Sequence, residues 1–308
     1  MRRYYDKNTT KKIAASVRQR LLNKARETKR PFSELLQYFA MERFLYRLSK
    51  SHHSDKFVLK GALMLTVWQV PFSRPTMDID LLGRIDNDMK VIIDMTKDVC
   101  TREVEPDGVI FDVDSVTGER ITEDADYEGV RIRFRGELDT ARISMQLDIG
   151  FGDVVVPLAE PVDYPTILDP PGPHLYGYSM ESTVAEKFEA MVKLGLLNSR
   201  MKDFFDIGLL SRQFDFEGHT LQEAVKVTFS TRGTNIPSTP TVFTPDFAKD
   251  ATKDAQWRAF VRKNQLTNIP RDFQATVSSV ATFLSPIVEG LANNQHIQSS
   301  WKAFGPWS

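Results

Sequence analysis

The chain has 308 residues, of which 41% are hydrophobic and 26% charged, with a formal net charge of −1. This composition is typical of a globular protein of one or two domains, and the single cysteine, Cys100, excludes an intramolecular disulfide and fits a reducing compartment. No stretch approaches the roughly 20 apolar residues that span a bilayer, and residues 1–12 lack the apolar core of a signal peptide. We therefore expect a cytoplasmic protein with no membrane partner.

Basic residues are concentrated near the N-terminus. Residues 1–50 carry 14 Lys and Arg against 4 Asp and Glu, a net charge of +10, so the remainder carries −11. Residues 226–264 are also basic, with 7 Lys and Arg against 3 Asp. Such a separation of charge suggests a polyanionic partner, although a solvated helical face that keeps the protein soluble explains it equally well.

The first 70 residues predict two helices, a strand and a third helix. In residues 9–28, apolar residues recur at helical spacing between basic residues. Ser33 precedes a broad apolar periodicity that is typical of an N-capped helix. Residues 57–60 predict a strand, and Gly61 predicts a turn into a helix from about residue 62, which the sequence VPFSRP ends.

Residues 74–81, RPTMDIDL, contain two aspartates in what otherwise resembles a buried strand. With a period of two, Met77, Ile79 and Leu81 point to one face, and Asp78 and Asp80 to the other. Two carboxylates about 6.5–7 Å apart on one face of a strand repel each other. A divalent cation between them would make the arrangement favourable.

The remainder of the chain predicts a small sheet followed by helices. We expect a helix over residues 89–99 and strands over 108–117, 128–136 and 142–149. We expect helices over residues 181–197, 199–214, 246–264 and 272–291, with an exposed loop at 236–245. The Pro-rich residues 164–173 indicate a boundary. The predicted fold is α+β, with a mixed sheet flanked by helices in residues 1–170 and a largely helical domain in residues 171–308.

Three features that can carry chemistry occur in order: Lys60-Gly61-Ala62, Asp78-x-Asp80 and Asp148. Gly61 would let the backbone approach a ligand closely, and the helix after it would present N–H groups to an anion. Asp78 and Asp80 would hold one or two divalent ions that bridge to phosphate oxygens. Asp148 would complete the site from a neighbouring strand and activate an attacking hydroxyl. Nucleotidyl transfer needs a glycine turn, an Asp-x-Asp pair and a distant third carboxylate of this kind.

The series GA…DID…LDI resembles the DNA polymerase β-like nucleotidyltransferase superfamily. The segments FVLKGALML, FSRPTMDIDL, LDIGFGD, VAEKFEAMVKLG and SRMKDFFDIGLL resemble its AbiEii/AbiGii toxin branch, over about residues 10–285. One departure is Gly61-Ala62, where the superfamily usually has Gly-Gly or Gly-Ser. The alanine removes a hydroxyl and leaves backbone amides for any contact with phosphate.

The resemblance implies a toxin enzyme that transfers a nucleoside monophosphate from an NTP to an acceptor and releases pyrophosphate. It implies Mg²⁺ or Mn²⁺ at Asp78, Asp80 and Asp148, an RNA acceptor such as the 3′ end of tRNA, and a cognate antitoxin. Blocked translation and growth, in a toxin–antitoxin or phage-defence system, would follow. In the C-terminal half, it implies that Lys187 contacts the triphosphate. Lys202 and Asp206 would complete the active site, with Asp206 favoured over Asp203.

The residues by themselves leave simpler interpretations open. Lys187 lies beside an apolar stripe and is by itself typical of a solvated lysine. Lys202 and Asp206 are four residues apart, as in a helical ion pair. Thr76, two residues before Asp78, would either bond to backbone or place its hydroxyl at the mouth of the metal site. In the second case a phosphate on Thr76 would block NTP binding, so Thr76 is a candidate regulatory residue.

Two other functions remain open. A small-molecule nucleotidyltransferase of the antibiotic-modifying kind would share the site, but a strongly basic surface would have no purpose in it. The second is a nucleotide-binding regulator that has lost catalytic activity. An inactive site would be expected to have lost one of the three carboxylates, and all three are present here. No helix-turn-helix pattern precedes the predicted sheet. The five histidines form no HExxH pair, and His52 and His53 cannot share one helical face because they are adjacent, so we expect no zinc site.

Overall fold

The computed structural model describes residues 7–71, 74–124, 127–267, 269–270 and 272–308. Contacts divide the chain into two compact units. The sheet unit comprises Met1–Trp68, Pro75–Gly152 and Glu160–Gly177, and the helical unit comprises Gln69–Arg74, Asp153–Ala159 and Tyr178–Ser308. The chain passes between the units more than once. The predicted domain boundary between residues 170 and 171 stays a prediction.

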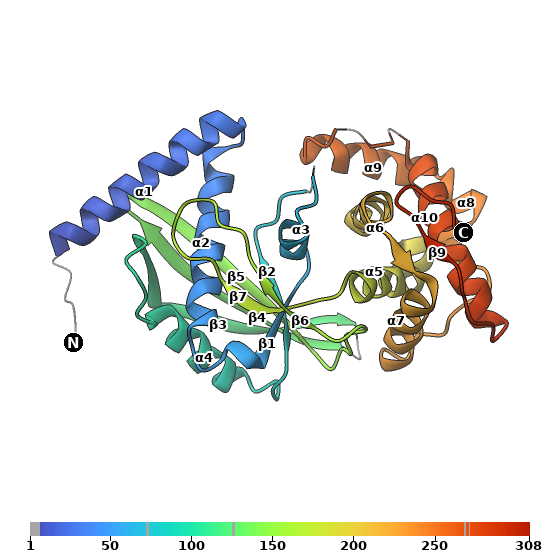
Figure 1. The fold of residues 1–308 in the computed structure, drawn as a ribbon, viewed down its shortest axis with the longest axis horizontal. Coiled ribbons are helices and arrows are strands. Elements are labelled where there is room, and N and C mark those ends of the chain that lie inside the picture. Colours follow the sequence, from blue (N-terminus) through green and yellow to red (C-terminus); the bar gives the residue numbers. More distant parts are fainter. Residues whose placement is uncertain (1–6, 72–73, 125–126, 268, 271) are drawn as a thin grey trace. The chain divides into compact units, whose positions relative to one another are not determined.

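The sheet unit contains a seven-stranded mixed sheet in the order β3-β4-β5-β2-β1-β7-β6 (Figure 1). The strands are β1 Phe57–Lys60, β2 Ile79–Gly83, β3 Val109–Asp124, β4 Tyr127–Leu138, β5 Ala141–Phe151, β6 Glu160–Asp163 and β7 His174–Gly177. The pairs β2–β5 and β1–β7 are parallel, and the others are antiparallel. The predicted α+β class is confirmed. The short strands β6 and β7 were not predicted, because four residues show too little alternation.

Helices cover the apolar face of this sheet. They are α1 Lys7–Thr28, α2 Phe32–Ser49, α3 Leu63–Val67 and α4 Met89–Thr101. Figure 1 shows α2 lying across the strands, and α2 contacts β5 and β7. Phe44 of α2 has its ring centroid 5.8 Å from that of Phe111 on β3 and 5.2 Å from that of Phe134 on β4. This aromatic cluster anchors α2 to the sheet by burying ring area.

Two basic residues of the N-terminal segment are internal. Arg43 is 1% exposed and pairs with Glu42 at 2.7 Å, and the buried Arg47 pairs with Asp107 at 2.7 Å. A buried charge needs such a partner. Among residues 11–50, the exposed basic side chains are therefore largely those on and just after α1. Ser33 is not the cap of α2, because the helix already begins at Phe32, and Pro31 occupies the N-cap.

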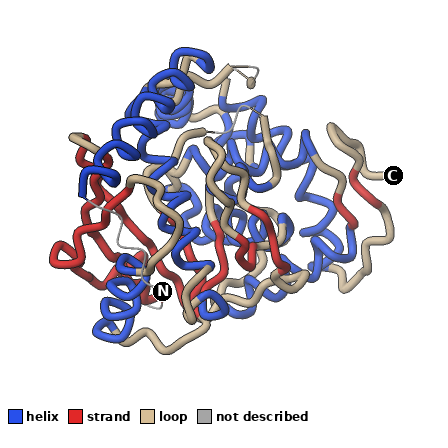
Figure 2. The backbone as a smooth tube through the Cα atoms, turned by 60° about the vertical axis from the view of Figure 1, so that its left-hand side comes forward, coloured by secondary structure: helices blue, strands red, loops and turns tan. Residues whose placement is uncertain are grey.

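The helical unit holds the remaining elements. They are α5 Met180–Leu194, α6 Met201–Gln213, β8 Phe216–Glu217, α7 Gly218–Thr231, α8 Pro245–Ala248, α9 Ala251–Lys263, α10 Phe273–Ala292 and β9 Ser300–Trp301. Figure 2 shows helices predominating here, with the short β8–β9 pair near the C-terminus. Its core is rich in phenylalanine: Phe204 packs against Phe247 and Phe273 with ring centroids 5.9 and 5.0 Å away. Helix α7 was not predicted.

Among the described residues, one helix, Phe273–Ala292, is long and apolar enough to cross a membrane by length and composition alone, and 44% of its apolar window is buried. The expectation that no stretch would reach this length is therefore wrong. Val277, Phe283 and Leu284 of this helix are at most 2% exposed. Helix α10 packs against α6, α7 and α9, as the core helix of a globular unit does.

Candidate active site

Three carboxylates converge at the adjacent interior strands β2 and β5 of the sheet. Strand β2 lies between β1 and β5, and the register pairs Asp80 with Lys60 on one side and with Asp148 on the other. One carboxylate oxygen from each of Asp78, Asp80 and Asp148 lies within 4.8 Å of the others. Residues 68 positions apart in sequence are thus neighbours because β2 and β5 are parallel and adjacent.

Asp78 lies just before β2, which begins at Ile79. The alternation predicted for this stretch therefore holds only from Ile79 onward: Ile79 and Leu81 are at most 2% exposed, whereas Met77 is 60% exposed. The expectation that Met77 faces the core is wrong, because a residue outside the strand does not follow its period. Asp78 is held by a local contact instead, since the Thr76 hydroxyl donates a hydrogen bond to its Oδ1.

Thr76 is 6% exposed, and its backbone N–H donates to the Tyr38 hydroxyl at 3.1 Å. It was expected on the strand, but it lies in the segment that leads into it. Its hydroxyl nevertheless faces the carboxylate cluster through Asp78. The side chain is thus positioned by contacts on both sides, one to α2 and one to the cluster.

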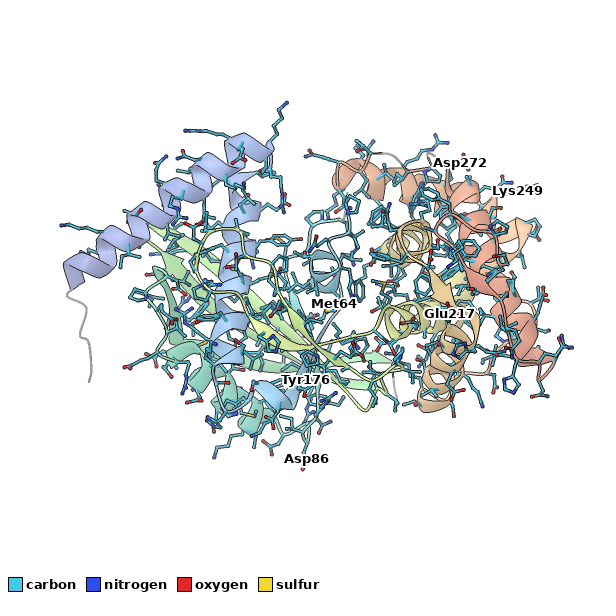
Figure 3. All side chains as sticks on the ribbon, viewed as in Figure 1. Met64, Asp86, Tyr176, Glu217, Lys249 and Asp272 are labelled. Atoms are coloured by element: carbon cyan, nitrogen blue, oxygen red, sulfur yellow. The ribbon has the colours of Figure 1, made fainter. Side chains whose placement is uncertain are left out.

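Gly61 permits the close approach of Asp80. The residue has a φ of +71°, and a Cβ placed on it would lie 1.9 Å from Asp80 Oδ2 and 2.6 Å from Cγ. A side chain at this position would meet both backbone strain and a direct clash. The helix that follows, α3, has only five residues, and Met64 on it (labelled in Figure 3) packs against Gly177 of β7. Binding of phosphate by the backbone amides of Gly61 and Ala62 stays a prediction, as does a role for the half-buried Lys60.

Arg131 of β4 holds Asp148 in place. Its Nε donates to Oδ1 at 2.8 Å and its Nη2 to Oδ2 at 2.7 Å, while Gln146 Nε2 donates to Oδ2 at 3.2 Å. These hydrogen bonds to Asp148 raise the pKa of Arg131, although partial burial works in the opposite direction. Sequence reasoning missed Arg131. The signal was the alternation of Arg131 and Arg133 with apolar residues on a strand next to Asp148.

The donor set fits a hard divalent cation. Three carboxylates with oxygens within 4.8 Å of one another provide the ligands that Mg²⁺ and Mn²⁺ prefer. Asp148 is 17% exposed on its side chain, so the cluster is open to solvent and to a ligand. Oδ2 accepts from both Arg131 and Gln146, whereas Oδ1 accepts from Arg131 and keeps a second lone pair for a further contact.

The C-terminal candidates form a different cluster, within the helical unit. Lys187 Nζ of α5 lies 2.7 Å from Asp206 Oδ2 and 3.2 Å from Asp203 Oδ1, and Arg74 reaches Asp206 at 2.9 Å. Arg200 contacts Asp203 at 2.8 Å. Both aspartates are at most 1% exposed. Although burial raises the pKa of Asp206, the charges of Arg74 and Lys187 outweigh it and lower the pKa to about 2.

Two simpler interpretations of these residues are wrong. Lys187 is not a solvated lysine, because its side chain is 14% exposed and held in ion pairs. Lys202 is exposed on α6, while the Asp206 carboxylate faces Lys187 and Arg74 instead. Contact of Lys187 and Lys202 with nucleotide, and a catalytic role for Asp206, stay predictions.

A family model described as the nucleotidyl transferase AbiEii toxin of type IV toxin–antitoxin systems matches residues 43–279. The chain belongs to this family. It is a toxin-type nucleotidyltransferase, and the resemblance found in its motifs is confirmed. Membership of the AbiEii family implies a nucleotide substrate and an antitoxin partner. The family also normally uses a divalent metal, consistent with the carboxylate cluster.

Two crystal structures from Helicobacter pylori are similar to this AbiEii-family chain. One is the structure of a candidate nucleotidyltransferase with 15% sequence identity and a TM-score of 0.47. The alignment covers 85% of this chain and 98% of that protein's chain. The other is JHP933, with 14% sequence identity and a TM-score of 0.46, and the alignment covers 85% of this chain and 94% of the JHP933 chain. No curated protein matches the chain. The assignment therefore depends on the family match.

Proposed function

We propose that this AbiEii-family enzyme transfers a nucleoside monophosphate from an NTP to the 3′ end of tRNA in the cytoplasm, using Mg²⁺ or Mn²⁺, and so blocks translation and growth. A role in phage defence is part of the proposal. The observation that carries it is the convergence of Asp78, Asp80 and Asp148. Three carboxylates this close repel one another, and a divalent cation between them would offset this repulsion beyond what Arg131 does at Asp148.

Each residue then has a defined task. Asp78, Asp80 and Asp148 would hold the cation, which, when bound, neutralises charge on the phosphates. Gly61 leaves the room that Asp80 occupies. Asp148, oriented by Arg131, accepts the proton of the acceptor hydroxyl. The hydroxyl oxygen then forms a bond to the α-phosphorus of the NTP. The bond from that phosphorus to the bridging oxygen breaks, and pyrophosphate leaves.

An RNA acceptor is favoured over a small molecule by the surface of α1 and the turn after it. Lys11, Lys12, Arg26, Lys29 and Arg30 are exposed there. Lysine and arginine on an open helix can contact phosphates without regard to sequence, with a strong dependence on salt. The second basic segment supports the proposal less than its composition suggests. Arg232 binds Asp153 and Glu189 at 3.0 Å each, and Lys253 is only 9% exposed.

The test is to incubate the purified protein with each labelled NTP and total RNA, in the presence of Mg²⁺. We expect label on RNA of tRNA length, in amounts that fall as the salt concentration rises. The Asp80→Asn variant is the control for a contaminating activity. Label on a small molecule instead of RNA would favour the antibiotic-modifying alternative. Binding of NTP with no transfer to either would favour an inactive regulator.

We also propose that modification of Thr76 silences the enzyme. A phosphate there would bring about −1.5 to −2 charges beside Asp78, where the cation is to bind. Because Thr76 is 6% exposed, the segment before β2 must open for a modifying enzyme to reach it. We expect Thr76→Glu to be inactive and Thr76→Ser, which keeps the hydroxyl bonded to Asp78, to be active. Full transfer by Thr76→Glu would refute the role.

A further inference from the structure

The turn that follows α2 brings two histidines and an aspartate together. Helix α2 ends at Ser49, and the next regular element is a short 3-10 helix, Ser54–Lys56, so His52 and His53 are not on an α-helix. Their ring centroids are 3.8 Å apart. The expectation of no zinc site rested on the absence of an HExxH pair and on the argument that adjacent histidines cannot share a helical face. That argument fails here, because a turn can point neighbouring side chains the same way.

The third member, Asp98, comes from α4. One ligand atom from each of His52, His53 and Asp98 lies within 4.8 Å of the others. Asp98 Oδ2 is 3.1 Å from His53 Nε2 and 3.7 Å from His52 Nδ1. Bonds of about 2.0–2.1 Å to a tetrahedral metal place neighbouring ligand atoms about 3.3 Å apart. The two observed distances, from Asp98 Oδ2 to His53 Nε2 and to His52 Nδ1, are close to this ligand–ligand separation.

His53 is unusual among the described residues. Its side chain is only 7% exposed, its Nδ1 has no hydrogen-bond partner there, and its Nε2 faces the Asp98 carboxylate. A buried polar atom without a partner costs about 1–3 kcal/mol. Metal ions bind the neutral imidazole ring through one of its nitrogens.

We propose that His52, His53 and Asp98 bind a divalent first-row transition metal, with Zn²⁺ as the best match. Two imidazoles and one carboxylate are a zinc ligand set, and a water would take the fourth position. The His52 and Asp98 side chains are 70% and 49% exposed, so the ion can enter from solvent. The ion would fasten the turn between α2 and β1 to α4. This site is separate from Asp78, Asp80 and Asp148 and does not depend on the proposed acceptor.

The test uses the full chain, stripped with a chelator and dialysed. We titrate it calorimetrically with ZnCl₂ in the presence of excess Mg²⁺, which keeps the carboxylate cluster occupied. We expect one equivalent of zinc to bind with a dissociation constant in the micromolar range or below. Co²⁺ in place of zinc should give the visible absorption of a tetrahedral site, and zinc should raise the thermal unfolding midpoint.

The variants His52→Asn and Asp98→Asn change exposed side chains, so the fold should persist. Each should weaken zinc binding by at least the roughly 10- to 100-fold that loss of an outer-sphere partner costs. His174→Asn is the matched control, because His174 also pairs with an aspartate, Asp163, at 2.7 Å and is 63% exposed. It should bind zinc as the wild type does. Absence of saturable binding to the wild type, or equal binding by His52→Asn and Asp98→Asn, would overturn the proposal.

Discussion

The carboxylate cluster of the sheet unit and the Asp203–Asp206 cluster of the helical unit use the same side chain in opposite ways. In the helical unit, Lys187, Arg74 and Arg200 come from three different segments and compensate two aspartates that are at most 1% exposed. In the sheet unit, Arg131 forms an ion pair with Asp148, whose side chain is 17% exposed. One carboxylate oxygen of Asp148 lies within 4.8 Å of oxygens of Asp78 and Asp80. The comparison teaches that spacing in the sequence does not distinguish a structural acid from a ligand.

What distinguishes them is the burial of the carboxylates, at most 1% exposed in the helical cluster and 17% for Asp148 in the sheet cluster. A fully buried carboxylate must be paired, because removing it from water costs several kcal/mol. A carboxylate that faces solvent can remain ionised beside others and be joined by a mobile cation. The helical cluster is therefore expected to support stability, and the sheet cluster to support activity.

The largest expected effect is on activity at the sheet cluster. Asp80→Asn keeps the shape of the side chain and removes a charge that the cation needs. Transfer should fall by about 10³-fold or more, equivalent to about 4 kcal/mol in the barrier. Single-turnover transfer of labelled nucleotide measures it. The unfolding midpoint should stay the same or rise, because repulsion is relieved. Asp112→Asn, on β3, is the control and should retain activity. A large loss of stability in Asp80→Asn would contradict the comparison.

The reverse pattern is expected at the helical cluster. Lys187→Met leaves Asp203 and Asp206 buried with one fewer cation, and should lower the free energy of unfolding by about 3 kcal/mol. Urea unfolding of the variant and the wild type measures this. Lys202→Met, which changes an exposed lysine on α6, should alter stability by less than about 0.5 kcal/mol. Equal stability of the two variants would show that Lys187 is not structural, and would favour its predicted role in binding the triphosphate.

Gly61→Ala tests whether the position of Asp80 matters beyond its charge. The new methyl group would meet Asp80 Oδ2 at 1.9 Å and displace it. A displacement of about 1 Å can cost roughly 100-fold in rate. Gly152→Ala is the matched control: its φ is +82°, but no atom lies within 4 Å of an added Cβ, so it carries the backbone strain without the clash. Steady-state assays should show the loss only in Gly61→Ala. Similar losses in both variants would assign the effect to strain.

The smallest effect is a pH dependence in the helical cluster. The pKa of Asp206 is about 2 in the folded protein, below its ordinary value of 3.8. The folded state therefore binds fewer protons than the unfolded state as pH falls below about 4. This contribution, about 2 kcal/mol, is fully present above that pH and is lost as pH falls through about 2. Chemical unfolding between pH 5 and pH 2 should show a steeper fall for the wild type than for Asp206→Asn. Parallel curves would mean that Asp206 is not held ionised.

Much of the secondary structure and the family followed from the sequence alone. The alternation in β5 and the helical periods of α1, α2, α4, α5 and α10 are long enough to be recognised, because local burial repeats along each element. The strand β1 and the turn at Gly61 were also predicted. The short β6 and β7, the start of β2 and the cap of α2 were not, because in these places neighbouring segments decide the backbone.

By itself, the sequence determined which residues are predicted to carry chemistry and their order along the chain: Gly61, Asp78, Asp80 and Asp148. Only the tertiary structure decided their partners. The pairing of Arg131 with Asp148, the burial of Lys187 between two aspartates and the meeting of His52, His53 and Asp98 all join segments that are distant in sequence. The physical reason is that Coulomb interactions and metal coordination act over a few ångströms in space. Only strand register and helix packing set those distances.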